Sequence, residues 1–248
     1  MSLKKDNYKS SDKKIMNFAI NLADNNKYYT GTNPSVGCVI VKNNKILSFA
    51  TTNYGGRPHA ESIALNKNKN NKGASLYSTL EPCSHHGITP PCTNAIINNK
   101  VKRVYYSIED KDLRSFNKTK KILNLKKIVV MSGLQKRDVK RLYNEYNFIR
   151  LHKAPYIIGK IASSLNLNIL RNNSPITNEH SKSVSHILRF QNHAILTSYK
   201  TINTDNPKLN CRLNGLEKFS PSVVVIDKNL KIKINSYVIK NSKQSKLI

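Results

Sequence analysis

The chain has 248 residues, enough for one or two domains with a substantial core. Its 42 Lys and Arg residues outnumber its 14 Asp and Glu residues, which gives a formal net charge of +28. No apolar run approaches about 18 residues, and the polar N-terminal segment lacks the apolar stretch of a secretory signal, so we expect a cytoplasmic protein without membrane association. Its four cysteines are then expected to be reduced thiols, which excludes a disulfide scaffold.

The positive charge has two explanations. Lys and Asn each occur 33 times and share A/T-rich codons, so a compositional drift of the genome explains both excesses together. A nucleic-acid-binding protein would have clustered charges and a larger share of Arg, whereas Lys is scattered along this chain and Arg occurs 9 times. We therefore favour drift and keep an RNA-binding or RNA-editing protein as an alternative. Under either explanation, a positive field favours a phosphorylated substrate.

The first half alternates between helix and strand patterns. Apolar residues at helical spacing predict a helix over residues 15–23, and strands over 36–41 and 45–50 flank a turn at Asn43 and Asn44. The next predicted elements are helices over residues 59–65, 93–99 and 118–123, and strands over 75–79, 101–108 and 127–131. This alternation predicts an α/β layered fold.

A longer helical pattern over residues 136–149 ends the first half, and a linker over 150–155 follows. The remaining predicted elements are a strand over residues 156–163, a helix over 181–190, and strands over 194–197 and 222–226. We therefore expect two domains, residues 1–149 and residues 150–248.

The chain has three candidate metal ligands: His59, Cys83 and Cys92. His59 begins the sequence His-Ala-Glu61, Cys83 follows a proline, and eight residues separate Cys83 from Cys92. One imidazole and two thiolates can bind Zn²⁺ and leave the fourth tetrahedral position for water, whereas a structural zinc site normally has four protein ligands. Zinc lowers the pKa of its bound water toward neutrality, and Glu61 is close enough in sequence to move protons between that water and a substrate. The pattern predicts a zinc-dependent hydrolase of the nucleobase-deaminase type.

The other cysteines and the nearby histidines have simpler interpretations. His85 and His86 lie between the two ligand cysteines and are alternative ligands, although we favour hydrogen-bonding or loop-packing roles for both. Cys38, in an apolar run, and the isolated Cys211 are interpreted as small buried hydrophobic residues.

Three motifs narrow the class: STLEPCSHHGITPPC at residues 78–92, NPSVGCVIV at 33–41 and GGRPHAE at 55–61. Common cytidine and tRNA-adenosine deaminases have two residues between their cysteines, whereas eight separate them here. With these motifs the chain resembles the bifunctional riboflavin-biosynthesis deaminase/reductases over roughly residues 12–230. The resemblance implies a three-layer cytidine-deaminase-like domain followed by a partial dihydrofolate-reductase-like domain.

The resemblance also implies a reaction and a site. Water would replace the 2-amino group of 2,5-diamino-6-(5-phosphoribosylamino)pyrimidin-4(3H)-one and give 5-amino-6-(5-phosphoribosylamino)uracil and ammonia. The implied site residues are the zinc ligands His59, Cys83 and Cys92, the catalytic proton shuttle Glu61, and the substrate contacts Asn33, Asp110 and Asp112. The family's prolines beside the two aspartates are replaced by Lys111 and Leu113, so a solvated turn is an equal alternative there.

In the second half, the resemblance implies a reductase that uses NADPH. The implied contacts are Ser163, Thr201 and Asp205 to the cofactor, and Arg189, Leu209 and Arg212 to the substrate, although a solvated charge is an equal alternative for either arginine. The family's Ser-Leu-Asp-Gly is Ser-Leu-Asn-Leu at residues 164–167 here, the chain ends before the family's C-terminal strands, and no glycine follows Gly215 to approach a pyrophosphate. We expect a homo-oligomeric deaminase with an inactive reductase half; a fully bifunctional enzyme is the alternative.

Overall fold

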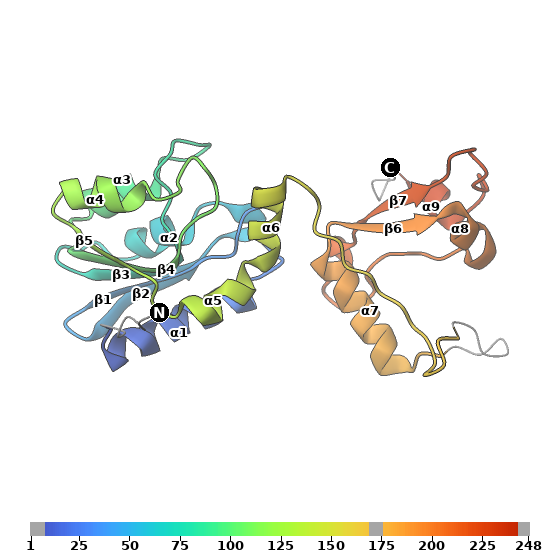
Figure 1. Ribbon diagram of the computed structural model, residues 1–248, viewed down its shortest axis with the longest axis horizontal. Helices are drawn as coiled ribbons and strands as arrows, with labels where there is room; N and C mark the ends of the chain where they lie inside the picture. Colours follow the sequence, from blue (N-terminus) through green and yellow to red (C-terminus); the bar gives the residue numbers. More distant parts are fainter. Residues whose placement is uncertain (1–7, 169–175, 243–248) are drawn as a thin grey trace, which may run out of the picture. The chain divides into compact units, whose positions relative to one another are not determined.

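The computed structural model describes residues 8–168 and 176–242 and separates into two compact units, Met1–Ile157 and Ile158–Ile248 (Figure 1). Both units mix helices and strands, so the predicted α/β class is confirmed. Helix α6 (Asn144–His152) runs across the position at which we divided the two domains. The assignment of one activity to residues 1–149 and another to residues 150–248 stays a prediction. No helix among the described residues is long and apolar enough to span a membrane.

The first unit contains a five-stranded sheet in the order β2-β1-β3-β4-β5. Its strands are β1 (Gly37–Lys42), β2 (Lys45–Thr51), β3 (Ser75–Leu80), β4 (Arg103–Ile108) and β5 (Val129–Ser132). Strand β1 pairs antiparallel with β2 and β3, and the β3–β4 and β4–β5 pairs are parallel. The predicted turn between the first two strands is present, with Asn43 and Asn44 at positive φ angles of 49° and 60°. Asparagine tolerates this left-handed conformation, which suits a tight hairpin turn.

Helices cover both faces of this sheet (Figure 1). Figure 1 shows α1 (Ser10–Asn25) and α5 (Lys136–Leu142) on one face, and α2 (Ala60–Asn66), α3 (Cys92–Asn98) and α4 (Thr119–Leu125) on the other. Alternate residues of a strand point to opposite faces, so Cys38 and Ile40 pack in the larger core cluster, while Val39 and Val41 pack in the cluster with α1. The predicted three-layer architecture of the first domain is confirmed.

Close packing of helix α1 on strand β1 explains one glycine. A Cβ atom added at Gly37 would lie 1.9 Å from the backbone oxygen of Ala19, so any side chain there would push the helix from the sheet. Ser35 Oγ also donates a hydrogen bond of 2.7 Å to the carbonyl of Ala23 at the end of the same helix. The segment leading into β1 is thus tightly held, which matters because the motif at residues 33–41 contains Asn33.

Two predicted elements differ in the structure. The helix predicted over residues 136–149 is two helices, α5 and α6, which meet at Tyr143 (φ −106°, ψ 12°). The buried hydroxyl of Tyr143 donates to the carbonyl of Ser35 at 2.9 Å and lies 2.6 Å from Thr79 Oγ1, so the chain bends where this ring enters the core. The strand predicted over residues 156–163 is wrong: the segment is irregular, and Ile157 and Ile161 are each 81% exposed.

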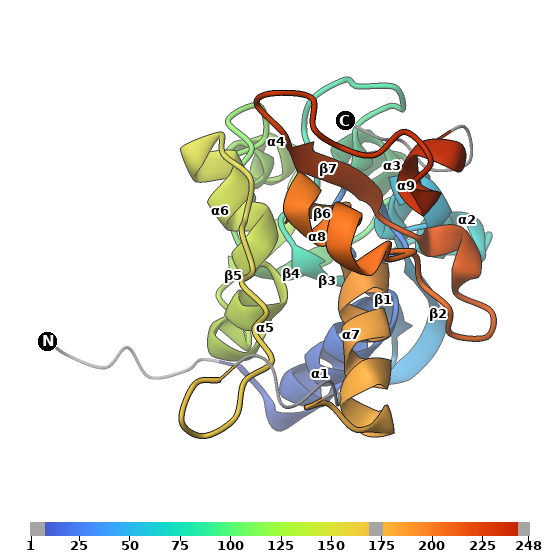
Figure 2. The ribbon, with the colours of Figure 1, turned by 90° about the vertical axis from the view of Figure 1, so that its right-hand side faces the viewer.

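The second unit is built around two parallel strands, β6 (Ala194–Ser198) and β7 (Ser222–Ile226), which lie side by side in Figures 1 and 2. Its helices are α7 (Glu179–Gln191), α8 (Tyr199–Asp205) and α9 (Tyr237–Lys240). Short 3₁₀ turns occur at Tyr54–Gly56 (η1) in the first unit and Glu217–Phe219 (η2) in the second. Among the described residues, the core cluster of this unit has four buried members: Ile202, Leu209, Val223 and Val238.

Candidate functional site

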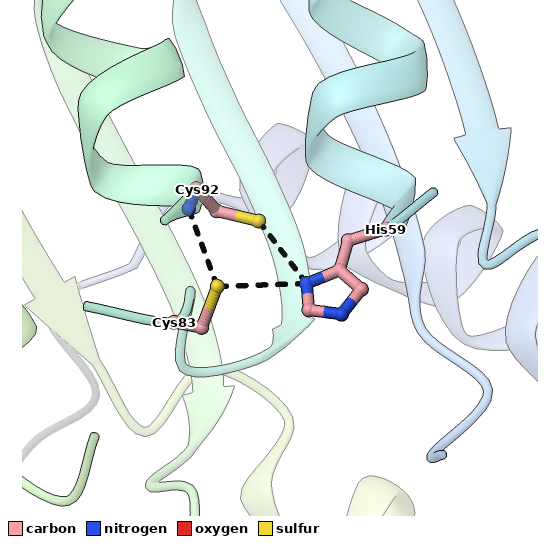
Figure 3. Close-up of side chains that lie close together, drawn as sticks. All are labelled: His59, Cys83 and Cys92. Atoms are coloured by element: carbon pink, nitrogen blue, oxygen red, sulfur yellow. Dashed lines mark hydrogen bonds between the residues drawn. The ribbon is translucent and has the colours of Figure 1, made fainter. Parts of the chain in front are cut away.

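Three side chains from separate elements of the first unit meet at one point (Figure 3). His59 immediately precedes helix α2, Cys92 begins helix α3, and Cys83 follows strand β3. The Nδ1 atom of His59 lies 3.5 Å from Cys83 Sγ and 3.4 Å from Cys92 Sγ, and all three ligand atoms lie within 4.8 Å of one another. The structure therefore brings together the three residues that the sequence predicts as metal ligands.

The spacing of these atoms fits a zinc ion. Tetrahedral coordination with Zn–S bonds of about 2.3 Å and a Zn–N bond of about 2.0–2.1 Å places ligand nitrogen and sulfur atoms about 3.6 Å apart. The two nitrogen–sulfur distances here are 3.5 and 3.4 Å, so this donor set fits zinc with little movement. Three protein ligands leave one coordination position for a non-protein group, as in catalytic zinc sites.

The two thiols behave as a pair because they lie side by side. The hydrogen bond from Cys92 Sγ, together with the neighbouring His59, lowers the pKa of Cys83 to about 4, and the backbone N–H of Cys92 also donates to Cys83 Sγ at 3.2 Å. The same hydrogen bond, followed by burial, raises the pKa of Cys92. Hydrogen bonding to Cys83 raises the pKa of His59. Without a cation, Cys83 is therefore the thiolate and Cys92 the thiol. A bound cation would also favour the thiolate form of Cys92.

Glu61 lies beside these ligands without being one of them. Its side chain is 3% exposed, Oε1 accepts a hydrogen bond of 2.9 Å from Ser78 Oγ, and Oε2 lies 3.5 Å from Cys92 Sγ as an acceptor. Burial raises the pKa of the Glu61 carboxyl above its ordinary value. A carboxyl held at the edge of a metal centre, with a pKa moved toward neutrality, is suited to taking up and releasing protons.

The histidines between the two cysteines lie outside this ligand group. His85 Nδ1 is 2.8 Å from Ser115 Oγ, and the His85 side chain lines the pocket beside the ligands. His86 is exposed. Among the described residues, the group with metal-binding geometry contains His59, Cys83 and Cys92.

A pocket of about 520 Å³, open mouth included, adjoins the ligands. Asn33, Asp110 and Asp112 line it together with His59 and Glu61, so the predicted substrate contacts are brought to the predicted metal site. Whether they contact a substrate stays a prediction.

Backbone geometry explains how Asn33 is held in the pocket wall. Its side-chain amide donates to the carbonyl of Gly56 at 3.3 Å. Gly56 has a φ of +91°, and a Cβ atom added there would lie 2.3 Å from Asn33 Nδ2 and 2.7 Å from the carbonyl oxygen of Thr30. A residue with a side chain is therefore excluded at position 56, which ties the motif at residues 55–61 to the motif at 33–41.

The loop that carries the two aspartates is not the solvated turn that we kept as an alternative. Asp110 and Asp112 are 6% and 8% exposed. Asp110 Oδ1 accepts hydrogen bonds from the Tyr146 hydroxyl and the Asp112 backbone N–H, both at 3.0 Å. Asp112 binds the side chain of Arg114 through both carboxylate oxygens, at 2.9 and 2.6 Å, and these contacts hold the pKa of Asp112 well below its usual range. Side-chain hydrogen bonds therefore order this loop where the family has prolines.

Sequence reasoning missed four pocket residues. Arg57, Arg114, Tyr146 and Arg150 line the pocket, and we had placed Arg150 in a linker. Arg57 stands in the motif at residues 55–61, two positions before His59, and that motif was the signal for it. Arg114, Tyr146 and Arg150 belong to no motif and reach the pocket through the tertiary fold. For these three, the replacement of the family's prolines was the one available signal, since it showed that another contact had to order the loop that contains Arg114.

In the second unit, the structure brings together some of the predicted residues. Arg189 Nη1 donates to the carbonyl of Asn210 at 3.1 Å and lies 3.3 Å from His186 Nδ1, while the backbone N–H of Arg212 donates to the same His186 nitrogen at 3.2 Å. Burial and the two arginines lower the pKa of His186. These contacts form a cationic cluster.

The remaining predicted contacts of this unit lie on other segments. Leu209 belongs to the small core cluster. Thr201 and Asp205 are exposed on helix α8, four residues apart and so on one face, whereas Ser163 lies in the irregular segment after α6. Their predicted role in cofactor binding stays a prediction.

Comparison with known proteins matches both halves of the chain. Residues 9–108 match the family described as the cytidine and deoxycytidylate deaminase zinc-binding region, and residues 155–248 match the RibD C-terminal domain. The riboflavin biosynthesis protein RibD of Aquifex aeolicus is 37% identical over 232 residues, which are 92% of this chain and 65% of that protein. RibD of Escherichia coli K12 is 36% identical over 211 residues, which are 84% of this chain and 58% of that protein. The chain thus spans 58 to 65% of the length of these curated relatives.

Solved structures agree with these matches. Acinetobacter baumannii RibD has a TM-score of 0.88 at 30% identity, over 96% of this chain and 69% of that chain. A Thermotoga maritima protein described as a diaminohydroxyphosphoribosylaminopyrimidine deaminase/5-amino-6-(5-phosphoribosylamino)uracil reductase has a TM-score of 0.85 at 32% identity, over 96% of this chain and 68% of that chain. Because both domains match in order and the first contains the His–Cys–Cys group of a zinc-binding deaminase region, the chain belongs to the RibD family of riboflavin-biosynthesis deaminase/reductases.

Proposed function

We propose that the chain is a zinc-dependent deaminase that converts 2,5-diamino-6-(5-phosphoribosylamino)pyrimidin-4(3H)-one to 5-amino-6-(5-phosphoribosylamino)uracil and ammonia. The observation that carries this proposal is the buried Glu61 carboxylate beside a His–Cys–Cys group whose spacing fits zinc. A structural zinc site would need neither an open coordination position nor a neighbouring carboxylate that is not a ligand.

The reaction is a hydrolysis in which one C–O bond forms and one C–N bond breaks at the same ring carbon. Bound zinc would activate the attacking water by lowering its pKa. Glu61 takes one proton from that water and delivers it to the ring nitrogen next to the attacked carbon. It then takes the second proton from the hydroxyl now on that carbon and gives it to the amino group, which leaves as ammonia. Ser78 holds Glu61 Oε1, which leaves Oε2 on the side of the ligands to carry the proton.

The other residues of the pocket bind and orient the substrate in this proposal. Asn33, fixed by its contact with Gly56, offers an amide to the polar edge of the pyrimidine. Asp110 and Asp112 line the same pocket and would face the sugar part of the substrate.

For the second unit, we propose that the Arg189 and Arg212 cluster binds an anionic group but that the unit does not reduce a substrate with NADPH. The cluster supports anion binding because both guanidinium groups contact Asn210: Arg189 Nη1 donates to its carbonyl oxygen at 3.1 Å, and Arg212 Nη1 donates to its Oδ1 at 2.9 Å. Leu167 argues against the reductase: it has a φ of +62° at the position where the family has glycine, a conformation that costs a leucine about 1–2 kcal/mol. A working bifunctional enzyme is the competing proposal, and the predicted homo-oligomer stays a prediction.

The deaminase proposal is tested with zinc-loaded protein and the phosphorylated diaminopyrimidine in water enriched in heavy oxygen. We expect release of ammonia and a uracil product that carries the label on the carbon that lost its amino group. Release of ammonia without label in the product would contradict direct hydrolysis, and a zinc-loaded protein that releases no ammonia would contradict the proposed activity.

A further inference from the structure

The pocket has two chemically different ends. At the inner end, the lining residue Glu61 is 3% exposed, and its Oε2 lies 3.5 Å from Cys92 Sγ. At the mouth, the side chains of Arg114 and Arg150 are 58% and 36% exposed. A substrate that reaches the metal ligands with one end therefore places its other end against guanidinium groups.

Two of the three pocket arginines already use their donors within the protein. Arg57 Nη1 donates to Thr89 Oγ1 at 2.8 Å, in the loop between the two cysteines. Arg114 donates to Asp112 through its backbone N–H and through two guanidinium nitrogens, Nε and Nη2. Neither guanidinium can turn toward a ligand without breaking contacts that hold a pocket loop in place.

Arg150 is held in position but its donors are available. Its Nη1 atom lies 3.7 Å from Asp112 Oδ2, an ion pair that is too long for a hydrogen bond. Its guanidinium lies over the ring of Tyr146, 5.3 Å from the ring centre, and Asp110 fixes the Tyr146 hydroxyl at 3.0 Å. Stacking on a fixed aromatic ring orients a guanidinium without consuming its N–H groups.

The charges at the mouth also favour an anion. The one carboxylate of Asp112 forms ion pairs with both Arg114 and Arg150. One negative charge therefore balances only one of the two positive charges. Asp110 and Glu81 also line the pocket, but their carboxylates are already engaged. Asp110 Oδ1 accepts from the Tyr146 hydroxyl and the Asp112 backbone N–H, and Glu81 accepts from three backbone N–H groups.

We propose that Arg150 binds the 5′-phosphate of the deaminase substrate at the mouth of this pocket and thereby selects the phosphorylated over the dephosphorylated aminopyrimidine. This inference rests on the proposed deaminase function. The planar fork of an arginine matches two oxygens of a phosphate, and the stack on Tyr146 presents that fork beside the pocket. Asp110 and Asp112 line the same pocket, and Asp112 contacts both Arg114 and Arg150, which suits a ribose next to the phosphate.

The test compares ammonia release from the phosphorylated diaminopyrimidine and from its dephosphorylated riboside. For Arg150→Gln we expect the KM for the phosphorylated substrate to rise about ten- to one-hundred-fold, the range typical of lost hydrogen bonds to a charged group, with kcat changed little. The KM for the riboside should stay unchanged. Arg150→Lys keeps the positive charge but loses the planar fork. Its KM for the phosphorylated substrate should lie between those of the unchanged protein and Arg150→Gln. An unchanged preference for the phosphorylated substrate in Arg150→Gln would overturn the proposal.

Arg141→Gln is the matched control, because Arg141 is an exposed arginine on α5 that does not line the pocket. It makes the same change in net charge and should leave both KM values as they are. An equal loss in Arg141→Gln would show a general field effect and would overturn a specific role for Arg150.

A binding measurement separates failure of this inference from failure of the proposed function. Ribose 5-phosphate is titrated calorimetrically into the zinc-loaded full chain carrying Arg189→Gln and Arg212→Gln, which removes the cationic cluster of the second unit. Binding that is lost on adding Arg150→Gln supports the phosphate site even in a chain that releases no ammonia. Binding that survives this substitution, in a chain that does release ammonia, refutes the site and leaves the deaminase intact.

Discussion

The two units of the chain differ in how much core supports their candidate sites. In the first, buried side chains from five strands and the helices on both faces form two continuous clusters. In the second, the described residues provide two strands and a four-member cluster. The metal-ligand group lies at the ends of elements that are anchored in the larger core, whereas Thr201 and Asp205 are exposed on a seven-residue helix. A site that needs ligand atoms placed to within about half an ångström depends on such anchoring.

The largest expected effect is the loss of the metal. Cys92→Ala removes one of three protein ligands, so we expect zinc content after dialysis to fall from about one ion per chain to near zero, and ammonia release to fall with it. The measurement is elemental analysis of the purified protein. Cys38→Ala is the matched control, since Cys38 is fully buried in the core and lies outside the ligand group. Equal zinc retention in the two variants would show that the metal is held elsewhere.

The next effect concerns turnover with the metal still bound. Glu61→Gln preserves the size of the side chain and its contact with Ser78 but removes the proton acceptor. We expect kcat to fall about 10²- to 10⁴-fold at unchanged zinc content, the range typical of a lost general acid–base group. A fully active Glu61→Gln protein would contradict the proposed role of this carboxylate.

A substitution in the core of the second unit tests whether the two units unfold independently. Ile202 is 1% exposed and belongs to the four-member cluster, so Ile202→Ala should lower the free energy of unfolding of the second unit by about 2–5 kcal/mol. Amide hydrogen exchange should then accelerate in residues 176–242, while exchange in the first unit and zinc content stay the same. Faster exchange in β1 and β3 of the first unit would show that the two units unfold together.

The smallest predicted effect is pH-dependent. The folded pKa of Asp112 lies below its unfolded value of about 3.9, so the stabilisation it provides is complete above that pH and is lost as the pH falls through the folded pKa. Asp112→Asn should therefore cost about 1–2 kcal/mol near pH 7 and progressively less below about pH 4, as measured by urea unfolding. Glu109→Gln, which breaks a more exposed ion pair with Lys136, should cost less than about 0.5 kcal/mol. A constant cost of Asp112→Asn from pH 7 to pH 3 would contradict this.

Much of the first unit follows from sequence patterns because local and tertiary signals agree there. Apolar spacing predicts the strands and helices, and the position of Cys92 at a helix start predicts that it can approach Cys83. The strand over residues 156–163 failed for a physical reason: Ile157 and Ile161 fit a strand pattern, but a strand also needs a neighbour to pair with.

The residues at the mouth of the pocket could not be predicted from the sequence, because their contacts also depend on the tertiary fold. Arg150 and Tyr146 come from helix α6, and the aspartates that contact them come from the loop after β4. No spacing rule connects residues that are 36 positions apart, the separation of Tyr146 from Asp110. The replaced prolines beside the aspartates indicated a change in the loop, but not the arginine that now orders it.

The central claim, that the first unit carries a complete deaminase site and the second does not carry a working reductase, is tested most directly by one assay. Zinc-loaded chain is given the phosphorylated diaminopyrimidine and NADPH, and ammonia release and NADPH oxidation are followed in the same sample. We predict ammonia in proportion to the substrate consumed and no oxidation of NADPH. NADPH oxidation that follows ammonia release would establish a bifunctional enzyme, and a sample with about one zinc per chain and no ammonia would contradict the account at its base.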